Sequence, residues 1–541
     1  MKKNSSSLAF HLSAAVMTAA ALQASADTVT DWNEYTILAT KGATSAITGN
    51  AGIALNTNVA TRIEAIEARA VFNAVNAINR FSPNSYYYHA GSTPAGLTPH
   101  SAEAAAAQAA HDVLLGTLPN NAAWTSTRAW LDSQLVSDLA ALGVSDADPG
   151  IATGRAAAQA AIAARTGDFS AIRTTYTPST NLSVSPAGTV VPNADGNPGA
   201  GLWRPSNGGA GVIDPVTGAP TGFDAQGAIL PAASIDFNWK NVKPFSLSTL
   251  EKQQLAAAVP PSLEIGSEEY NAELAFVQSH GQDSAHPGSR TEDQTLQALY
   301  YKSDAELFTN EAARIASLRR GLTLNENARL FAALDNALAD ARIAAWQSKY
   351  DLVFWRPITA LNADAAGNVA SYDWKPLAST PPHPSSTAGH STTVAAGAEI
   401  LRAFFKTDKI DQTGASVSLT TIPWLISTNN GTGRTNPLLN GSDATTREVS
   451  TFSQLQLENG QSRVYLGIHF GNDNYQGQTL GLAVADAIIK SKTDPAASGL
   501  SVFEGGRDIP TAKRLRSILI ADSANSGFFG LTDDKEHGEN H

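Results

Sequence analysis

Apolar residues at intervals of three and four recur along most of this chain, and they constrain its fold more than any other feature. This spacing places apolar side chains on one face of a helix, whereas a half-buried strand needs strict alternation, which almost no segment shows. The sequence therefore predicts an all-α fold, in which helical bundles are joined by long irregular loops. The predicted helices cover residues 58–79, 101–118, 148–165, 325–350, 391–405, 449–459 and 473–489.

Residues with helix-capping character indicate where two of these helices begin. Thr61 is followed three residues later by Glu64, which is the pattern of a capping box. Asp148 precedes Pro149, and proline suits the first helical position because it has no N–H group to leave unpaired. We therefore expect N-caps at Thr61 and Asp148.

Changes in composition divide the chain into five expected parts. Between residues 166 and 245 Gly, Pro, Asn and Ser dominate, but Trp203, Phe223, Phe237 and Trp239 are scattered among them. Because aromatic side chains need apolar surface to bury against, we favour an ordered cover over a disordered linker. The expected parts are a signal peptide (1–26), an N-terminal helical region (27–165), this loop-rich excursion (166–245), a helical catalytic core (246–495) and a C-terminal tail (496–541).

The first residues have the order of a secretory signal. Lys2 and Lys3 precede an uncharged apolar stretch at residues 8–22, and the small residues Ala-Ser-Ala at 24–26 then offer a cleavage site. We expect cleavage after this triplet and export to the periplasm or the exterior. No later run reaches about 18 uncharged apolar residues, so we expect no membrane span.

Composition excludes several kinds of chemistry. The chain has no Cys, and its two Met residues, Met1 and Met17, fall inside the expected signal peptide. Disulfides, a thiolate nucleophile, zinc–thiolate sites and iron–sulfur clusters are therefore excluded. A mature chain without sulfur would resist oxidants of its own making, although a compositional bias of the lineage explains the same count. The net charge of −12 argues against nucleic acid or an anionic membrane surface as a partner.

Two clusters of polar residues precede the predicted helix at 391–405. Lys349 ends the preceding long helix, and Arg356 stands before Pro357, which favours an extended segment. Basic residues at a helix C-terminus also complement its dipole, so this cluster alone has a purely structural explanation. Residues 382–391 then place Gly389 at a helix start, where backbone N–H groups bind anions. A turn with its N-cap at residue 391, a serine, explains the same residues.

A third cluster follows the predicted helix at 449–459. Ser462 and Arg463 are adjacent, and His469 and Asp473 lie four residues apart. If His469 begins a helix that Asp473 continues, the carboxylate lies on the same face and orients the imidazole through one ring N–H group. A hydrogen bond on a helix surface gives the same spacing.

These clusters together resemble the signature of the superfamily that joins type 2 phosphatidic acid phosphatases to vanadium-dependent haloperoxidases. The signature reads K-x6-R-P, then P-S-G-H, then S-R-x5-H-x3-D, and it is matched here between Lys349 and Asp473. The resemblance is close over residues 325–489, and the upstream helical region is similar to that of exported bacterial haloperoxidase-like members. It implies helical bundles that enclose one oxyanion site, with vanadate as the cofactor in a haloperoxidase.

The resemblance also implies which groups bind the oxyanion. Lys349, Arg356 and Arg463 would neutralise a tetrahedral, multiply charged anion, and the guanidinium groups would do so through forked hydrogen bonds. The backbone N–H of Gly389 would bind one equatorial oxygen. An acidic protein would then contain a locally cationic pocket.

Catalytic roles follow from the same resemblance. His469 would be the axial ligand of vanadate in a haloperoxidase, or the phosphoryl-accepting nucleophile in a phosphatase. Both roles need a neutral imidazole nitrogen, and Asp473 would fix the tautomer. His390 would be the acid–base histidine, which deprotonates peroxide in one reaction or protonates the leaving alcohol in the other. Lys349 would also polarise the peroxide.

The chain departs from the signature at two positions. Thr387 stands where the superfamily has Pro, and Ala388 stands where it has Ser. The second change matters more, because a hydroxyl donor to the oxyanion is lost. Ser386 and Thr387 carry the neighbouring hydroxyl groups that could replace it.

Two further positions bear on the choice of reaction. Trp346 and His383 fall where haloperoxidases place residues on the halide side of the pocket, and a histidine at this position resembles the algal bromoperoxidases. His383 is equally well explained as a loop residue held between two prolines. Asp304 matches the acidic partner of the acid–base histidine, although surface aspartates are common.

Three functions are compatible with these residues. The first is a haloperoxidase that oxidises halide, bromide or iodide by preference, with hydrogen peroxide to hypohalous acid. The second is a soluble exported acid phosphatase, which acts on phosphate monoesters through a phosphohistidine in the same pocket. The third is a helical binding protein with a decayed site, for which Ala388 is the main indication.

Overall fold

A computed structural model describes most of the chain. The expected signal peptide, Phe223 and the tail beyond residue 503 lie outside the described residues, and the five-part division of the chain stays a prediction. The described residues are 27–41, 55–171, 183–184, 190–191, 199–204, 212–213, 220–221, 236–369, 373–378, 380–420, 446–491 and 493–503.

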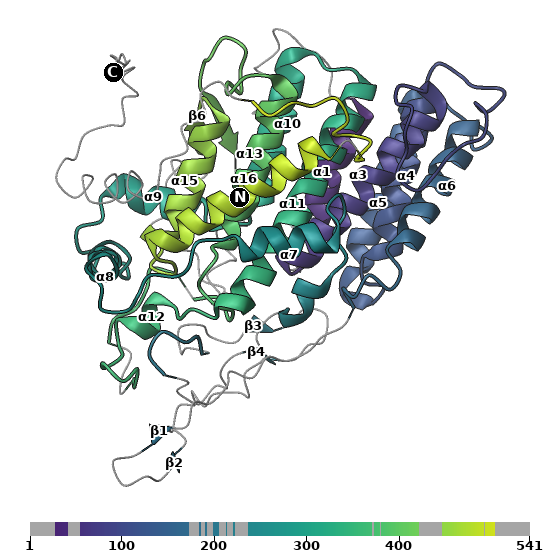
Figure 1. Ribbon diagram of the computed structural model, residues 1–541. Coiled ribbons are helices and arrows are strands. Elements are labelled where there is room, and N and C mark those ends of the chain that lie inside the picture. Colours follow the sequence, from purple (N-terminus) through teal and green to yellow (C-terminus); the bar gives the residue numbers. More distant parts are fainter. Residues whose placement is uncertain are drawn as a thin grey trace, which may run out of the picture.

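Helices make up most of the described residues, which confirms the predicted all-α fold (Figure 1). None of the helices in the described ranges has the length and apolar character to cross a membrane. The α-helices are α1 (Thr28–Thr40), α3 (Thr57–Asn79), α4 (Ser101–Thr117), α5 (Thr125–Leu142), α6 (Pro149–Ala164), α7 (Thr249–Ala257), α8 (Glu268–His280), α9 (Glu292–Tyr300), α10 (Ala305–Arg320), α11 (Leu324–Leu352), α12 (Pro357–Ala360), α13 (Gly389–Phe405), α15 (Phe452–Tyr465) and α16 (Gly471–Lys490), with short 3-10 helices η1 (Ala122–Trp124) and η2 (Phe237–Asn241).

The described strands form three short antiparallel pairs. The longest pair joins β5 to β6, with Val417 opposite Val449 and Thr420 opposite Thr446. The strands are β1 (Ser183–Val184), β2 (Val190–Val191), β3 (Val212–Ile213), β4 (Pro220–Thr221), β5 (Val417–Thr420) and β6 (Thr446–Val449).

Helix α11 is the centre of the fold. Thr323 caps it through a capping box with Glu326, and side chains all around its axis are buried. It packs against α3 on one side and against α13 on the other. Figure 1 shows α3, α4, α5 and α6 beside one another on one flank of the molecule, and α8, α9 and α15 on the opposite flank. Trp346 and Lys349, which lie near the C-terminal end of α11, are buried among these helices.

Small residues bring α13 and α16 into close contact. A Cβ atom on Gly477 would lie 2.6 Å from the carbonyl oxygen of Ala388, and one on Gly481 would lie 2.2 Å from that of Thr392. Only glycine permits such an approach of backbone to helix. The backbone N–H of Ala388 also donates to the carbonyl oxygen of Asp473 at 3.0 Å. The loop before α13 is thus fixed to the first turn of α16.

One predicted helix start is confirmed and one is wrong. Asp148 caps α6, since its Oδ1 accepts a hydrogen bond from Gly150 N at 2.8 Å. Helix α3 begins earlier than predicted, because Asn56 is its N-cap. The Thr61 hydroxyl instead donates to the carbonyl of Thr57 one turn back, a bond that a threonine inside a helix makes readily.

Part of the loop-rich excursion supports the segment that leads to Arg356. Trp203 is buried, with 1% of its surface exposed, and its backbone N–H donates to the carbonyl of Val353 at 2.8 Å. Trp355 N in turn donates to the carbonyl of Gly201 at 2.9 Å. This short antiparallel bridge fixes the extended backbone immediately before Arg356.

Candidate active site

Lys349 lies on the last turns of α11 and faces the loop before α13. It is fully buried, and its Nζ donates to the carbonyl oxygens of Pro384 at 2.8 Å and Ser385 at 3.1 Å. Burial, with the neighbouring charge of Arg356, lowers the pKa of Lys349 well below its usual value. An anion placed beside this ammonium group would therefore be strongly favoured.

Arg356 joins the loop to the segment before α16. Its Nε donates to the carbonyl of His383 at 2.9 Å, and its Nη1 donates to the carbonyl of Ile468 at 2.6 Å and to Nε2 of His469 at 3.0 Å. Burial lowers the pKa of Arg356 to about 9. The guanidinium group is thus held in place by backbone oxygens and imidazole nitrogens, and no carboxylate among the described residues pairs with it.

The tautomer of His469 follows from its two partners. Arginine has no acceptor, so Nε2 of His469 must carry a lone pair toward Arg356. Nδ1 then carries the proton and donates to Oδ2 of Asp473 at 3.1 Å. Burial, followed by the charges of Arg356 and Lys349, lowers the pKa of His469 well below its usual value. The imidazole is therefore neutral, with its basic nitrogen directed at the cations.

Asp473 is held by three donors. Besides His469, it accepts hydrogen bonds from the hydroxyl of Ser385 at 2.5 Å and from the backbone N–H of Phe470 at 3.0 Å. The expectation that His469 begins the helix is wrong, because α16 starts at Gly471 and the histidine lies in the turn before it. The carboxylate reaches it by folding back over the helix start.

Arg463 approaches from α15. Its Nη1 donates to the carbonyl of Tyr301 at 3.2 Å, whereas its buried Nε has no hydrogen-bond partner among the residues that the structure describes. Burial and the charge of Arg356 lower the pKa of Arg463 to about 9. A buried donor of this kind is costly unless something accepts from it.

The loop before α13 places backbone N–H groups beside these cations. Helix α13 begins at Gly389 with Ala388 at the N-cap, so the alternative of an N-cap at Ser391 is wrong, and Ser391 lies buried in the first turn. A Cβ on Gly389 would lie 3.4 Å from the ring of Trp346 and 3.9 Å from the side chain of Lys349. The helix start, whose first N–H groups have no partner within the helix, therefore faces α11.

His390 lies beside the cations Arg463 and Arg342. Its Nε2 donates to the carbonyl of Ser303 at 3.0 Å, which leaves Nδ1 as the nitrogen that can accept a proton. Burial, followed by the charges of Arg463 and Arg342, lowers the pKa of His390, and the carboxylate of Asp304 opposes them. The histidine is therefore neutral.

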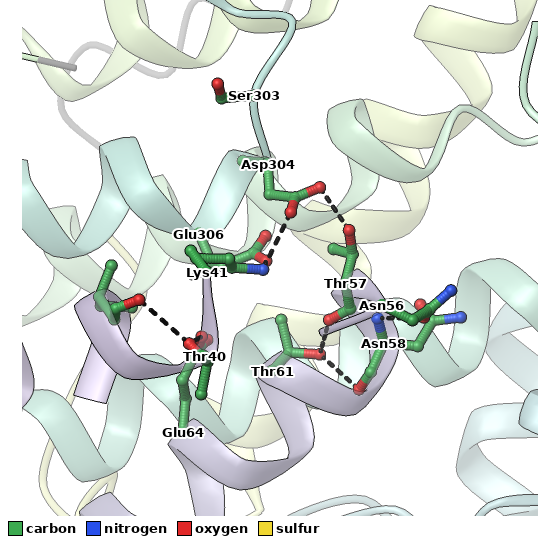
Figure 2. Close-up of polar contacts among 12 residues, drawn as sticks. Thr40, Lys41, Asn56, Thr57, Asn58, Thr61, Glu64, Ser303, Asp304 and Glu306 are labelled. Atoms are coloured by element: carbon green, nitrogen blue, oxygen red, sulfur yellow. Dashed lines mark hydrogen bonds and ion pairs between the residues drawn. The ribbon is translucent and has the colours of Figure 1, made fainter. Parts of the chain in front are cut away.

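Asp304 is held by residues of the N-terminal helices. Its carboxylate accepts from Nζ of Lys41 at 3.0 Å and from the hydroxyl of Thr57, as Figure 2 shows. Lys41 also pairs with the buried Glu306. The sequence associates Asp304 with the acid–base histidine. In the structure the charge of Asp304 acts on His390. The hydrogen bond of His390, however, goes to the carbonyl oxygen of Ser303.

Trp346 and His383 lie together, with 5.0 Å between their ring centroids. Nδ1 of His383 accepts from Nη2 of Arg356 at 3.0 Å. Burial, with the charges of Lys349 and Arg356, lowers the pKa of His383 well below its usual value. His383 therefore contacts the cationic cluster and is more than a residue held between two prolines.

The neighbours of Ala388 use their hydroxyl groups elsewhere. Ser386 donates to the side-chain oxygen of Gln476, and the hydroxyl of Thr387 is paired with that of Ser348 at 2.5 Å. Both bonds point toward helices that flank the loop. The suggestion that either residue replaces the lost serine hydroxyl therefore finds no support.

Sequence reasoning missed two residues of this site. Ser385 supports Asp473, and only the folded loop reveals that contact. Arg342 lies seven positions before Lys349 in α11. Seven residues make about two helical turns, so the spacing alone could have placed both side chains on one face of the helix. A guanidinium two turns from the predicted lysine was the available signal.

The donor set fits a tetrahedral oxyanion. Lys349, Arg356 and Arg463 provide buried positive charge, and the unpartnered Nε of Arg463 provides a donor that needs an acceptor. Nε2 of His469 offers one neutral lone pair among these donors. The oxygens of vanadate and of phosphate can accept hydrogen bonds from these cationic donors. The central vanadium or phosphorus atom can bind the neutral nitrogen of His469.

Sequence comparisons point to one superfamily. Residues 329–497 match the family model of the VCPO second helical-bundle domain. A vanadium chloroperoxidase of Curvularia inaequalis is 26% identical over 246 residues, or 39% of this chain. That match spans about a third of the relative, 36% of its length.

Solved structures share the fold over most of the chain. A bacterial vanadium-dependent iodoperoxidase aligns with a TM-score of 0.56 at 20% identity, covering 84% of this chain and 94% of that one. A holo-type bacterial vanadium-dependent chloroperoxidase aligns with a TM-score of 0.56 at 16% identity, covering 82% and 93% respectively. Residues 329–497 thus match the second helical-bundle domain of this family model, and the described residues share their helical fold with these two bacterial vanadium-dependent enzymes.

Proposed function

We propose that this protein is a vanadate-dependent haloperoxidase that oxidises bromide or iodide with hydrogen peroxide to hypohalous acid. The observation that carries the proposal is the lone pair of His469 Nε2, which lies 3.0 Å from Arg356 Nη1 within a set of buried cations. Burial lowers the pKa of Lys349, Arg356 and Arg463, so each of these charges is costly without a counter-anion. A multiply charged oxyanion would offset that cost.

The residues that would hold vanadate are those around this lone pair. Nε2 of His469 would bind the vanadium, and Lys349, Arg356, Arg463 and the N–H of Gly389 would bind the oxygens of the anion. Vanadate, when bound, supplies a Lewis acid that activates peroxide toward attack by halide. Asp473 keeps the proton on Nδ1 of His469, so that Nε2 stays available.

Proton transfer is assigned to His390. Its Nε2 is occupied by the carbonyl of Ser303, so Nδ1 takes the proton of incoming hydrogen peroxide. The lowered pKa of His390 supports this direction, because it favours the neutral imidazole, which is the form that accepts a proton. Lys349 places positive charge beside the reacting oxygen. Trp346 and His383 would line the side from which halide enters.

The test compares two reactions on one preparation. Purified protein loaded with orthovanadate is assayed for peroxide-dependent oxidation of bromide and iodide, and the vanadate-free protein is assayed for hydrolysis of p-nitrophenyl phosphate. We expect halide oxidation that depends on vanadate. Phosphate-ester hydrolysis without halide oxidation would assign the acid phosphatase reaction instead, and no turnover in either assay would favour a binding protein.

A matched pair of lysine variants localises the activity. Lys349→Met should abolish halide oxidation, whereas Lys252→Met should retain it, because Lys252 is equally buried but donates to the carbonyl of Lys240 and to Gln347 outside the site. Equal loss in both variants would show that burial of a lysine, and not its place in the cationic cluster, accounts for the effect.

We also propose that the protein is exported. The Lys2–Lys3 start and the small residues at 24–26 support this proposal. Expression of the full chain in a Gram-negative host should give periplasmic protein whose first residue is Asp27 by intact mass. Cytoplasmic protein that retains residues 1–26 would overturn the proposal.

A further inference from the structure

The proposed oxyanion site lacks one hydrogen-bond donor on the side of the loop before α13. Ala388 lacks the hydroxyl that the superfamily signature carries at this position, and the hydroxyls of Ser386 and Thr387 are paired with Gln476 and Ser348. A site of this kind loses one donor to the oxyanion unless another residue supplies it.

Arg342 lies at that side. Its Nη1 is 3.2 Å from the position that a Cβ on Gly389 would occupy, which makes it the atom nearest to that position. Trp346 and Lys349, at 3.4 and 3.9 Å, are the next neighbours and stand on the same face of α11. The guanidinium group therefore lies directly against the first residue of α13, next to Ala388.

The side chain of Arg342 is only partly engaged. It is 3% exposed, and its Nη2 donates to Oε2 of Glu306 at 3.2 Å, whereas its Nε has no hydrogen-bond partner within the described ranges. Glu306 is shared, because it also pairs with Lys41, which Figure 2 shows beside it. Glu306 thus holds Nη2 of the guanidinium group, and the buried Nε remains as an unpaired donor within the described ranges.

The charge of Arg342 reaches the groups that would handle the oxyanion. It lowers the pKa of Lys349, His383, His390 and Arg463, each after the larger effect of burial. A residue whose only role was to neutralise Glu306 would have no need to lie against the helix start that faces these groups.

We propose that Arg342 is an additional oxyanion-binding residue, which supplies from α11 the donor that Ala388 removed from the loop. This inference rests on the proposed oxyanion site. It makes the chain bind a tetrahedral oxyanion with a fourth cationic side chain, in addition to Lys349, Arg356 and Arg463.

Equilibrium binding tests the role of Arg342 directly. Isothermal titration calorimetry on the vanadate-free protein measures the affinity for orthovanadate and, separately, for inorganic phosphate. Arg342→Gln should weaken both by roughly ten- to a hundredfold, the range for a lost hydrogen bond to a charged group. The matched control is Arg402→Gln, since Arg402 is 2% exposed and pairs with buried Glu399 at 2.9 Å. We expect the control to bind like the unaltered protein.

A second variant keeps the proposal testable where Arg342→Gln fails to fold. Ala388→Ser restores the hydroxyl, and in the presence of Arg342 it should improve affinity less than about threefold, because the donor is already supplied. In the Arg342→Gln background the same change should recover roughly tenfold. A tenfold gain from Ala388→Ser alone, or unchanged affinity in folded Arg342→Gln protein, overturns the role of Arg342.

The outcomes also separate this inference from the proposed function. Binding that depends on Arg342 without halide oxidation would overturn the haloperoxidase proposal and leave the role of Arg342 standing. Binding that is independent of Arg342, together with halide oxidation, would overturn the role of Arg342 and leave the haloperoxidase proposal standing. Absence of binding to either oxyanion in the unaltered protein would overturn both.

Discussion

Nη1 of Arg356 donates to Nε2 of His469 at 3.0 Å, and this contact fixes the proton on the opposite ring nitrogen, where Asp473 accepts it. A guanidinium donor thus lies against a neutral lone pair in the cluster. An oxyanion that entered here would exchange the contact with Arg356 for a bond to the histidine, and the guanidinium would then face the oxygens of the anion.

His469→Ala should abolish retention of vanadate. The change removes the neutral nitrogen that faces Nη1 of Arg356, so the loss of affinity should exceed the roughly ten- to hundredfold that follows loss of an outer hydrogen-bond partner. Vanadate that remains after gel filtration of loaded protein is the measurement. His111→Ala is the control, because His111 is 7% exposed and pairs with Asp112 and Asp132 on the N-terminal helices. Equal retention in both variants would contradict the ligand assignment.

His390→Ala should slow turnover while the protein still retains vanadate. The variant loses the base at Nδ1, and general base catalysis typically contributes a factor of roughly 10²–10⁴. Steady-state halide oxidation and vanadate retention are measured on the same sample. Parallel loss of both properties would show that His390 binds the oxyanion and does not serve as the base.

Glu311→Gln should stabilise the protein above neutral pH. Burial raises the pKa of Glu311 from 4.5 to about 7, so the folded state holds a proton that the unfolded state releases. Stability therefore falls as pH rises between these two values, by up to about 3 kcal/mol. The amide removes this cost, and its oxygen still accepts from the N–H of Thr420, 2.7 Å from Oε1 of the native residue.

Chemical denaturation at pH 4 and pH 8 measures the effect of Glu311→Gln. The variant should match the unaltered protein at pH 4, where the carboxyl is protonated in both states, and exceed it at pH 8. Glu448→Gln, at an exposed position of β6, should show no such difference between the two pH values. A gain that is equal at both pH values would contradict the titration of Glu311.

Gly481→Ala should destabilise the fold by about 1–3 kcal/mol, the usual cost of forcing extra volume into a packed interface. The added Cβ would lie 2.2 Å from the carbonyl oxygen of Thr392, so α13 and α16 would have to separate. Thermal unfolding measures the loss. Gly91→Ala is the control, because a Cβ there would meet nothing within 4 Å. Equal melting temperatures for the two variants would contradict the tight contact between the helices.

The sequence predicted those parts of the fold that depend on local pattern. The spacing of apolar residues located α11 and α13 to within a few residues, and Asp148 capped α6 as predicted. Thr61 misled because its hydroxyl can cap a helix or bond back within one, and only the packed chain decides between these. The helix starts considered at His469 and Ser391 were wrong by a few residues, since α16 begins at Gly471 and α13 at Gly389.

The candidate site was only partly accessible from the sequence. Fixed spacing placed Lys349, Arg356, Arg463 and His469 in a shared motif, and the structure brings their side chains or charges together. The contact of Arg342 with the start of α13 joins residues 47 positions apart, and no local pattern encodes such a contact. Pairings of this kind arise from the packing of whole helices, which periodicity alone does not specify.

The bond between Lys41 and Asp304 spans 263 residues of sequence. The ammonium group of Lys41 also pairs with Glu306. Loss of α1 and the residues that follow it would therefore leave Asp304 and the fully buried Glu306 without this cation. A C-terminal fragment that kept every residue of the K-x6-R-P to H-x3-D motif would still lack this charge. A chimaera that replaced the N-terminal helices would therefore need a cation at the position of Lys41 to restore these two ion pairs.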